Sequence, residues 1–227
     1  MHAIAKKGAG EGGTHDLVAG SGSPRPAAKK KTKRSAEADP VKRAAFEKQQ
    51  AQMPAERLVF LDEFSIHTAL TPSYGRAPSG ERVVMPEPFV RERVSVITAL
   101  SLCGVHAPLT LPGAFDTEAF DLWVEQALVP FLLPNDLVIM DNVRFHFAGR
   151  ALSLIEAAGA RVVPLPPYSP DYNPSENCIS KIKQYLRKAK ARTLRKLNRA
   201  LAKALDTIAP EDIVGWFVHC GYVYSFE

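Results

Sequence analysis

Cysteine is scarce in this sequence of 227 residues, and the few that occur are widely separated. Cys103, Cys178 and Cys220 are an odd number and form no Cys-x-x-Cys pair. A disulfide framework or a zinc ribbon needs paired, closely spaced cysteines, so the sequence supports neither class. We therefore expect a protein of a reducing compartment.

Long apolar runs are missing as well. No stretch approaches the roughly 18 consecutive apolar residues of a membrane-spanning helix, and residues 1–18 lack the continuous apolar segment of a signal peptide. We expect a soluble protein of the cytoplasm. Apolar residues still make up 46% of the chain and charged residues 23%, which is enough for one sizeable core.

Acidic residues are absent from one long segment. Residues 177–205 contain ten Lys and Arg but no Asp or Glu, whereas residues 58–176 contain 14 acidic and 7 basic side chains. Carboxylates hold Mg²⁺, while Lys and Arg neutralise the nucleic-acid backbone. This segregation suits a metal site beside a phosphate-binding surface.

The chain divides into three predicted regions. Residues 1–36 have almost no large apolar side chain and predict a disordered basic tail. Residues 37–57 predict a linker with a short helix from Pro40, and residues 58–227 predict one domain. Its expected elements are a strand at 58–62, a hairpin at 93–102 and 105–111, a helix from Asp116, a strand at 137–141, a helix at 148–158, a strand at 161–165, and further helices. A hairpin combined with β-α-β crossovers predicts a mixed α/β sheet covered by helices.

Three acids stand at chemically suggestive places. Asp62 and Asp141 each end an apolar run predicted to be a strand, and Glu176 follows in a Pro-rich loop. Ligands in open α/β sheets bind beyond the carboxyl ends of strands, so these acids suggest a metal site. Each also has a simpler interpretation. A strand-end Asp is common in turns, and Glu176 at the third position of a helix that begins with Asn173-Pro174 can cap that helix.

The motifs together resemble the catalytic domain of bacterial insertion-sequence transposases of the mariner superfamily. The matching runs are Leu-Val-Phe-Leu-Asp62-Glu63, Asp141-Asn142-x-x-x-His146 and Pro-Pro-Tyr-Ser-Pro-Asp-Tyr-Asn-Pro-Ser-Glu176-Asn177. Between Asp141 and Glu176 lie 34 residues, the spacing associated with the Asp-Asp-Glu triad of that superfamily. The resemblance covers about residues 29–224.

The resemblance implies an RNase H-like, retroviral-integrase-like fold with a mixed five-stranded sheet flanked by helices. It implies that Asp62, Asp141 and Glu176 are the catalytic residues and hold two Mg²⁺ or Mn²⁺ ions. In the family's reaction, water cleaves at the transposon end and the freed 3′-hydroxyl attacks target DNA, typically at a TA step. Two divalent ions roughly 3.5–4 Å apart can activate such a nucleophile and neutralise the leaving oxygen. The implied partners are double-stranded DNA, as transposon ends and TA-containing target, and a second copy of the chain in a homodimer.

Nearby residues are supporting candidates or alternatives. Glu63 follows Asp62 and is an alternative ligand, although an extended strand would point it to the opposite face. Asp171 lies in Ser169-Pro170-Asp171, where a turn is the favoured interpretation. Asn142 is a candidate support for the second strand. For His146, orientation of Asp141, contact with DNA and a structural hydrogen bond all stay open.

The basic segment is predicted to contact DNA. Its candidate residues lie on two expected helices and are Lys181, Lys183, Arg187, Lys188, Arg192 and Arg195. A solvated helix face opposite a leucine stripe is the alternative. Ten cations without an acid exceed what solubility requires, which favours backbone contacts that position DNA without recognising its sequence.

The resemblance also has a gap. Transposases of this type carry N-terminal helix-turn-helix modules that recognise element ends, whereas 57 residues precede the first expected strand here. We expect a truncated or decayed reading frame, or the second half of an element expressed in two frames, acting near the nucleoid in a bacterial cytoplasm. Two other classes stay open: an RNase H-like nuclease without strand transfer, and a catalytically idle DNA-binding remnant.

Overall fold

The computed structural model describes residues 35–84, 86, 88–89, 91–141 and 149–222. The candidates Asn142 and His146 and nearly all of the predicted disordered tail lie outside the described residues. All the described elements belong to one compact unit, Arg34–Glu227. None of the helices in the described ranges is long and apolar enough to cross a membrane.

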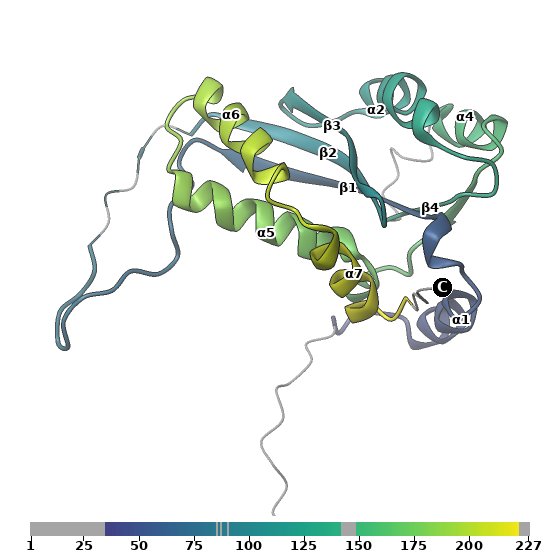
Figure 1. The fold of residues 1–227 in the computed structure, drawn as a ribbon, viewed down its shortest axis with the longest axis horizontal. Coiled ribbons are helices and arrows are strands. Elements are labelled where there is room, and N and C mark those ends of the chain that lie inside the picture. The colour runs from purple at the N-terminus through teal and green to yellow at the C-terminus, as the bar shows by residue number, and fades with distance from the viewer. Residues whose placement is uncertain (1–34, 85, 87, 90, 142–148, 223–227) are drawn as a thin grey trace, which may run out of the picture. The chain divides into compact units, whose positions relative to one another are not determined.

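A five-stranded mixed sheet in the order β3-β2-β1-β4-β5 forms the centre of this unit (Figure 1). The central strand β1 pairs antiparallel with β2 and parallel with β4. The outer pairs are β2 with β3, antiparallel, and β4 with β5, parallel. The strands are β1 Leu58–His67, β2 Arg93–Ser101, β3 Gly104–Pro112, β4 Leu137–Met140 and β5 Arg161–Pro164. The predicted mixed sheet is therefore confirmed.

Helices begin and end largely where the sequence indicates. Asp116 caps α2 by accepting a hydrogen bond from the Ala119 N–H at 2.8 Å, and Gly159, at φ +83°, follows the end of α4. The helices are α1 Pro40–Gln50, α2 Thr117–Trp123, α4 Ala151–Ala157, α5 Pro174–Ala189, α6 Leu194–Leu205 and α7 Pro210–His219. Shorter helical turns are η1 Ala55–Arg57, η2 Val124–Leu128, η3 Val129–Phe131 and η4 Pro170–Tyr172.

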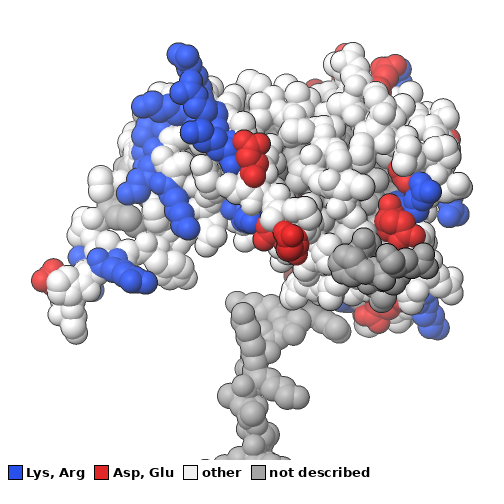
Figure 2. Space-filling model, viewed as in Figure 1, with Lys and Arg blue, Asp and Glu red and all other residues white. Residues whose placement is uncertain are grey.

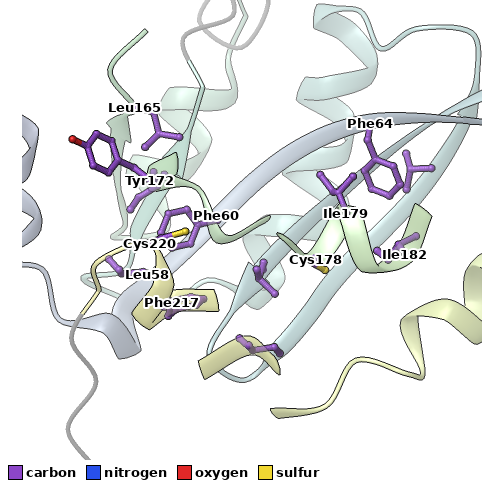
Figure 3. Close-up of a cluster of buried hydrophobic side chains, with 14 of the residues drawn as sticks. Leu58, Phe60, Phe64, Leu165, Tyr172, Cys178, Ile179, Ile182, Phe217 and Cys220 are labelled. Carbon is purple, nitrogen blue, oxygen red and sulfur yellow. The ribbon is translucent and has the colours of Figure 1, made fainter. Parts of the chain in front are cut away.

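Two apolar cores cover the two faces of the sheet. Phe60 and Phe64 of β1 face a core completed by α1, α5, α6 and α7 (Figure 3). In that core the rings of Phe60 and Phe217 meet edge to face, with centroids 5.3 Å apart. Val59 and Leu61 face the other core, completed by α2, η2 and α4. Burial on both faces explains why the strand sequences are continuously apolar.

The prediction that the first strand ends at Asp62 is wrong, because β1 continues to His67. Its antiparallel partner β2 still pairs with it there, through His67 and Arg93. The parallel partner β4, in contrast, ends at Met140. The register aligns Phe60 with Ile139, and its continuation places Asp62 level with Asp141. Asp62 therefore lies within a strand, at the point where the parallel neighbour stops.

Candidate active site

Asp62, Asp141 and Glu176 line one hollow of about 460 Å³. Asp62 comes from β1, Asp141 directly follows β4, and Glu176 lies in the first turn of α5. The other lining residues belong to the Pro-rich loop after β5: Leu165, Pro166, Pro167, Tyr168, Ser169, Pro170 and Asn173. The structure thus brings together three acids that are distant in sequence, around one opening in the molecule.

Asn173 connects two of these acids. Its side-chain Nδ2 donates a hydrogen bond to Asp62 Oδ2 at 2.8 Å, and its Oδ1 accepts one from the Ser175 N–H at 3.0 Å, which caps α5. One amide therefore orients the first carboxylate and begins the helix that carries Glu176. Sequence reasoning recognised the cap and missed the contact with Asp62. The available signal was chemical: an Asn that caps through its oxygen still has an N–H₂ to donate.

The carboxylate of Asp62 is held in an unfavourable environment for a negative charge. Burial first, and then the charges of Glu176 and Asp141, raise its pKa to about 8, against the lowering effect of the hydrogen bonds from the Glu63 N–H and Asn173. Like charges that share a site disfavour ionisation of one another. A bound cation would instead favour the ionised form of Asp62.

Glu176 does not act as the partner of a capping box in α5. The Asn173 N–H that such a Glu would bind instead donates to the Pro170 carbonyl at 3.0 Å. Glu176 is exposed, and its carboxylate is close enough to Asp62 to raise the pKa of that residue. The placement favours a role in the hollow over a capping role.

The three acids suit a divalent metal in donor type and position. Hard cations such as Mg²⁺ prefer carboxylate oxygens, and the mutual repulsion at Asp62 is what a cation would relieve. Within the described ranges, however, no group of three or more His, Cys, Asp or Glu side chains is yet arranged to hold a metal ion. The side chains must converge further before all three can bind the same ion.

Two alternative acids lie elsewhere. Glu63 alternates with Asp62 along β1, so it shares the face of Leu61 and not that of the hollow. Asp171 forms a two-point ion pair with Arg43 of α1, with N···O distances of 2.9 and 2.6 Å. The turn interpretation of Asp171 is therefore supported.

Three of the predicted DNA-contact residues take part in internal contacts. Lys181 pairs with Asp212 of α7. Arg192 donates from Nη1 to the carbonyls of Thr68 and Leu70, both at 2.9 Å, and the ammonium of Lys183 lies 5.6 Å from the ring centroid of Phe64. These residues help to hold the segment after β1 and the sheet against α5 and α7. A count of charges along the sequence cannot distinguish such cations from solvated ones.

The exposed basic side chains gather at the far end of α5 and on α6. Figure 2 shows this group of Lys and Arg side chains over the region of α6. Its exposed members in the described structure are Lys188, Lys190, Arg195, Lys196, Arg199 and Lys203. α5 has 16 residues, which at 1.5 Å per residue is about 24 Å. We call these six residues the α6 patch; its member Lys188 follows Glu176 by 12 residues on α5, which is roughly 18 Å along the helix axis.

Solved structures with the same architecture include several of Mos1. The Mos1 transposase paired-end complex with left transposon end has a TM-score of 0.66 and 14% identity, with 85% of this chain and 63% of that chain covered. The Mos1 mariner paired end complex with Mn gives 0.64 and 14%, covering 86% and 64%. The catalytic domain of Mos1 mariner transposase gives 0.55 and 15%, covering 82% and 92%. This chain thus spans about 63% of the length of the Mos1 chain in the first complex.

These likenesses define the class: the fold is RNase H-like, as the motifs predict. A family model described as DDE superfamily endonuclease matches residues 57–198, well over half of the chain. The chain belongs to this family. Comparison with curated proteins gives no significant match.

Proposed function

We propose that this chain is the catalytic part of a DNA transposase of the mariner superfamily, from a bacterial insertion sequence, which cleaves DNA and joins the freed end to target DNA. The observation that carries the proposal is the convergence of Asp62, Asp141 and Glu176 on one hollow, in a chain of the DDE endonuclease family. Its cellular site would be the bacterial cytoplasm near the nucleoid.

The proposed site residues divide the work. Two Mg²⁺ or Mn²⁺ ions held by the three carboxylates would supply an activated oxygen nucleophile and neutralise charge on the leaving oxygen. Asn173 fixes the orientation of Asp62 through its 2.8 Å hydrogen bond. The Pro-rich loop forms one wall of the hollow and limits how the sugar-phosphate chain can enter.

DNA is proposed to bind along α5 toward the α6 patch. The separation of roughly 18 Å between Glu176 and Lys188 corresponds to about five nucleotides at 3.4 Å each along a strand. The patch would therefore hold DNA well away from the cleaved bond and contribute affinity without sequence preference. The proposed partners are transposon-end DNA, a TA-containing target, and a second copy of the chain that holds the other end.

The test is a combined cleavage and strand-transfer assay with duplexes that carry the element ends, a supercoiled target, and Mg²⁺ or Mn²⁺. Joined products support the transposase. Cleavage without joining supports a nuclease without strand transfer, and absence of both identifies an idle DNA-binding remnant.

Replacement of Asp141 provides the residue-level check. Asp141→Asn should lower cleavage about a thousandfold, because a lost ligand removes several kcal/mol of transition-state stabilisation at about 1.4 kcal/mol per tenfold. Duplex affinity should be equal or slightly higher, since a negative charge near phosphate is removed. Glu63→Gln, on the other face of β1, is the matched control, and loss of cleavage in that variant would instead make Glu63 a ligand.

A further inference from the structure

Side chains of helix α1 bind the loop that lines the candidate site. The helix itself lies outside residues 57–198, which match the family model. The contact centres on Arg43, which is only 5% exposed. Its Nη1 donates to Ser169 Oγ at 2.8 Å and to Asp171 Oδ1 at 2.9 Å, and its Nη2 donates to Asp171 Oδ2 at 2.6 Å. Both residues belong to the turn just before the active-site Asn173.

Tyr172 is held by the same helix. The Arg43 guanidinium lies 4.2 Å from the centroid of the Tyr172 ring, and the Tyr172 hydroxyl donates to Glu47 Oε1 at 2.5 Å. Phe46 packs on the ring, with centroids 5.2 Å apart. Three side chains of α1 thus contact this tyrosine, Arg43 and Phe46 at its ring and Glu47 at its hydroxyl.

Asn173, the next residue in the chain, contacts the carboxylate of Asp62. Asn173 donates to Asp62 and caps α5, three residues before Glu176. Side-chain contacts and the backbone thus connect Arg43, through the turn and Tyr172, to Asp62 and to the first turn of α5, which carries Glu176. The two-point pairing of a planar guanidinium with a carboxylate fixes orientation as well as distance.

We propose that Arg43 is a positioning residue for the active site: through Ser169, Asp171 and Tyr172 it sets the placement of Asn173 and Glu176, and so the geometry in which the carboxylates bind divalent metal. The inference rests on the proposed function. It assigns α1 a role in the chemistry that a fold-stabilising helix would not have.

The test compares Arg43→Gln, Arg43→Lys and Asp171→Asn in the full chain, with Lys48→Gln as the matched control. Lys48 is an exposed cation on the same helix. The measurements are Mn²⁺ affinity by electron paramagnetic resonance, amide hydrogen exchange residue by residue, single-turnover cleavage, and duplex affinity. Exchange at the Tyr172, Asn173 and Glu176 amides is informative because each donates within this loop.

Arg43→Gln and Asp171→Asn should each speed exchange at these three amides by about tenfold to a hundredfold, the range expected for loss of a charge-assisted hydrogen bond. Mn²⁺ affinity and cleavage should fall together, while β-sheet exchange and duplex affinity stay as in Lys48→Gln. Arg43→Lys should recover part of the effect. If Arg43→Gln does not fold, Asp171→Asn carries the test, because Asp171 is on the surface.

Two results would overturn the inference. One is faster exchange throughout the sheet, with cleavage and Mn²⁺ binding reduced only in proportion to the unfolded fraction. The other is faster local exchange with normal Mn²⁺ affinity. If the unmodified chain does not cleave DNA, the proposed function fails, whereas the exchange and Mn²⁺ measurements still decide the role of Arg43.

Discussion

Burial and two neighbouring acids all raise the pKa of Asp62, so the protonation state of this carboxylate depends on what occupies the hollow. With its pKa near 8, the side chain of the metal-free protein is largely protonated at neutral pH. Binding of the proposed metal ions would therefore displace a proton, which would link occupancy of the site to pH.

The first prediction at this scale concerns stability against pH. Asp62 binds its proton more tightly in the folded chain, with a pKa of about 8, than in the unfolded chain, where an Asp titrates near 3.8. Its contribution is therefore fully present below about pH 4 and is lost as the pH rises toward 8. Urea unfolding without divalent metal, repeated from pH 5 to 9, should show this fall.

The variant Asp62→Asn serves as the control for that series, because an amide has no proton to lose. Its stability should not show the decline between pH 5 and 8 that we assign to Asp62. An unchanged decline in the variant would place the titrating group elsewhere.

At the scale of elements, helix α6 has one face that packs in the core and another that exposes basic side chains. Leu197 and Leu201 are buried in the core with α5 and α7, whereas Arg195 and Arg199 are exposed in the α6 patch. Arg192, just before the helix, belongs to neither face because its guanidinium holds the carbonyls of Thr68 and Leu70. A test of DNA binding must therefore leave Arg192 in place.

We predict that changing Lys188, Arg195 and Arg199 together to Gln flattens the salt dependence of duplex binding. Each phosphate contact contributes about 0.9 to the slope of log affinity against log salt, so three lost contacts lower the slope by up to about 2.7. All duplex sequences should weaken alike. Lys42, Lys48 and Arg161, exposed cations away from the patch, form the control triple, and an equal change in that variant would show that net charge alone is responsible.

The order of elements could be predicted from the sequence because alternating apolar runs and caps are local signals. The strand that carries Asp62 was predicted too short, since its length depends on β2, more than 25 residues away. Arg43 was missed for a similar reason: its helix has weak apolar periodicity, and its partner Asp171 is separated from it by 128 residues. Long-range polar contacts leave no pattern in the sequence near either partner.

For the whole molecule, the described DNA-contact candidates are Lys and Arg side chains suited to the phosphate backbone. We predict that the purified chain binds duplexes through these side chains with little preference for element ends. Competition between an element end and a random duplex of equal length should give an affinity ratio near one. A ratio well above one in favour of the element end would contradict this prediction.

The loop that carries the site is also held from the other end of the described chain. The Tyr222 hydroxyl donates to the Tyr172 carbonyl at 2.9 Å, and Gln50 of α1 donates to the Cys220 carbonyl at 2.8 Å. Tyr222 follows Glu176 by 46 residues, so at about 5–20 residues per second it is synthesised roughly 2 to 9 s later. During that interval a growing chain already contains every proposed catalytic acid but lacks the contact that completes their support. The proposed site is therefore fully supported only after Tyr222 has been synthesised.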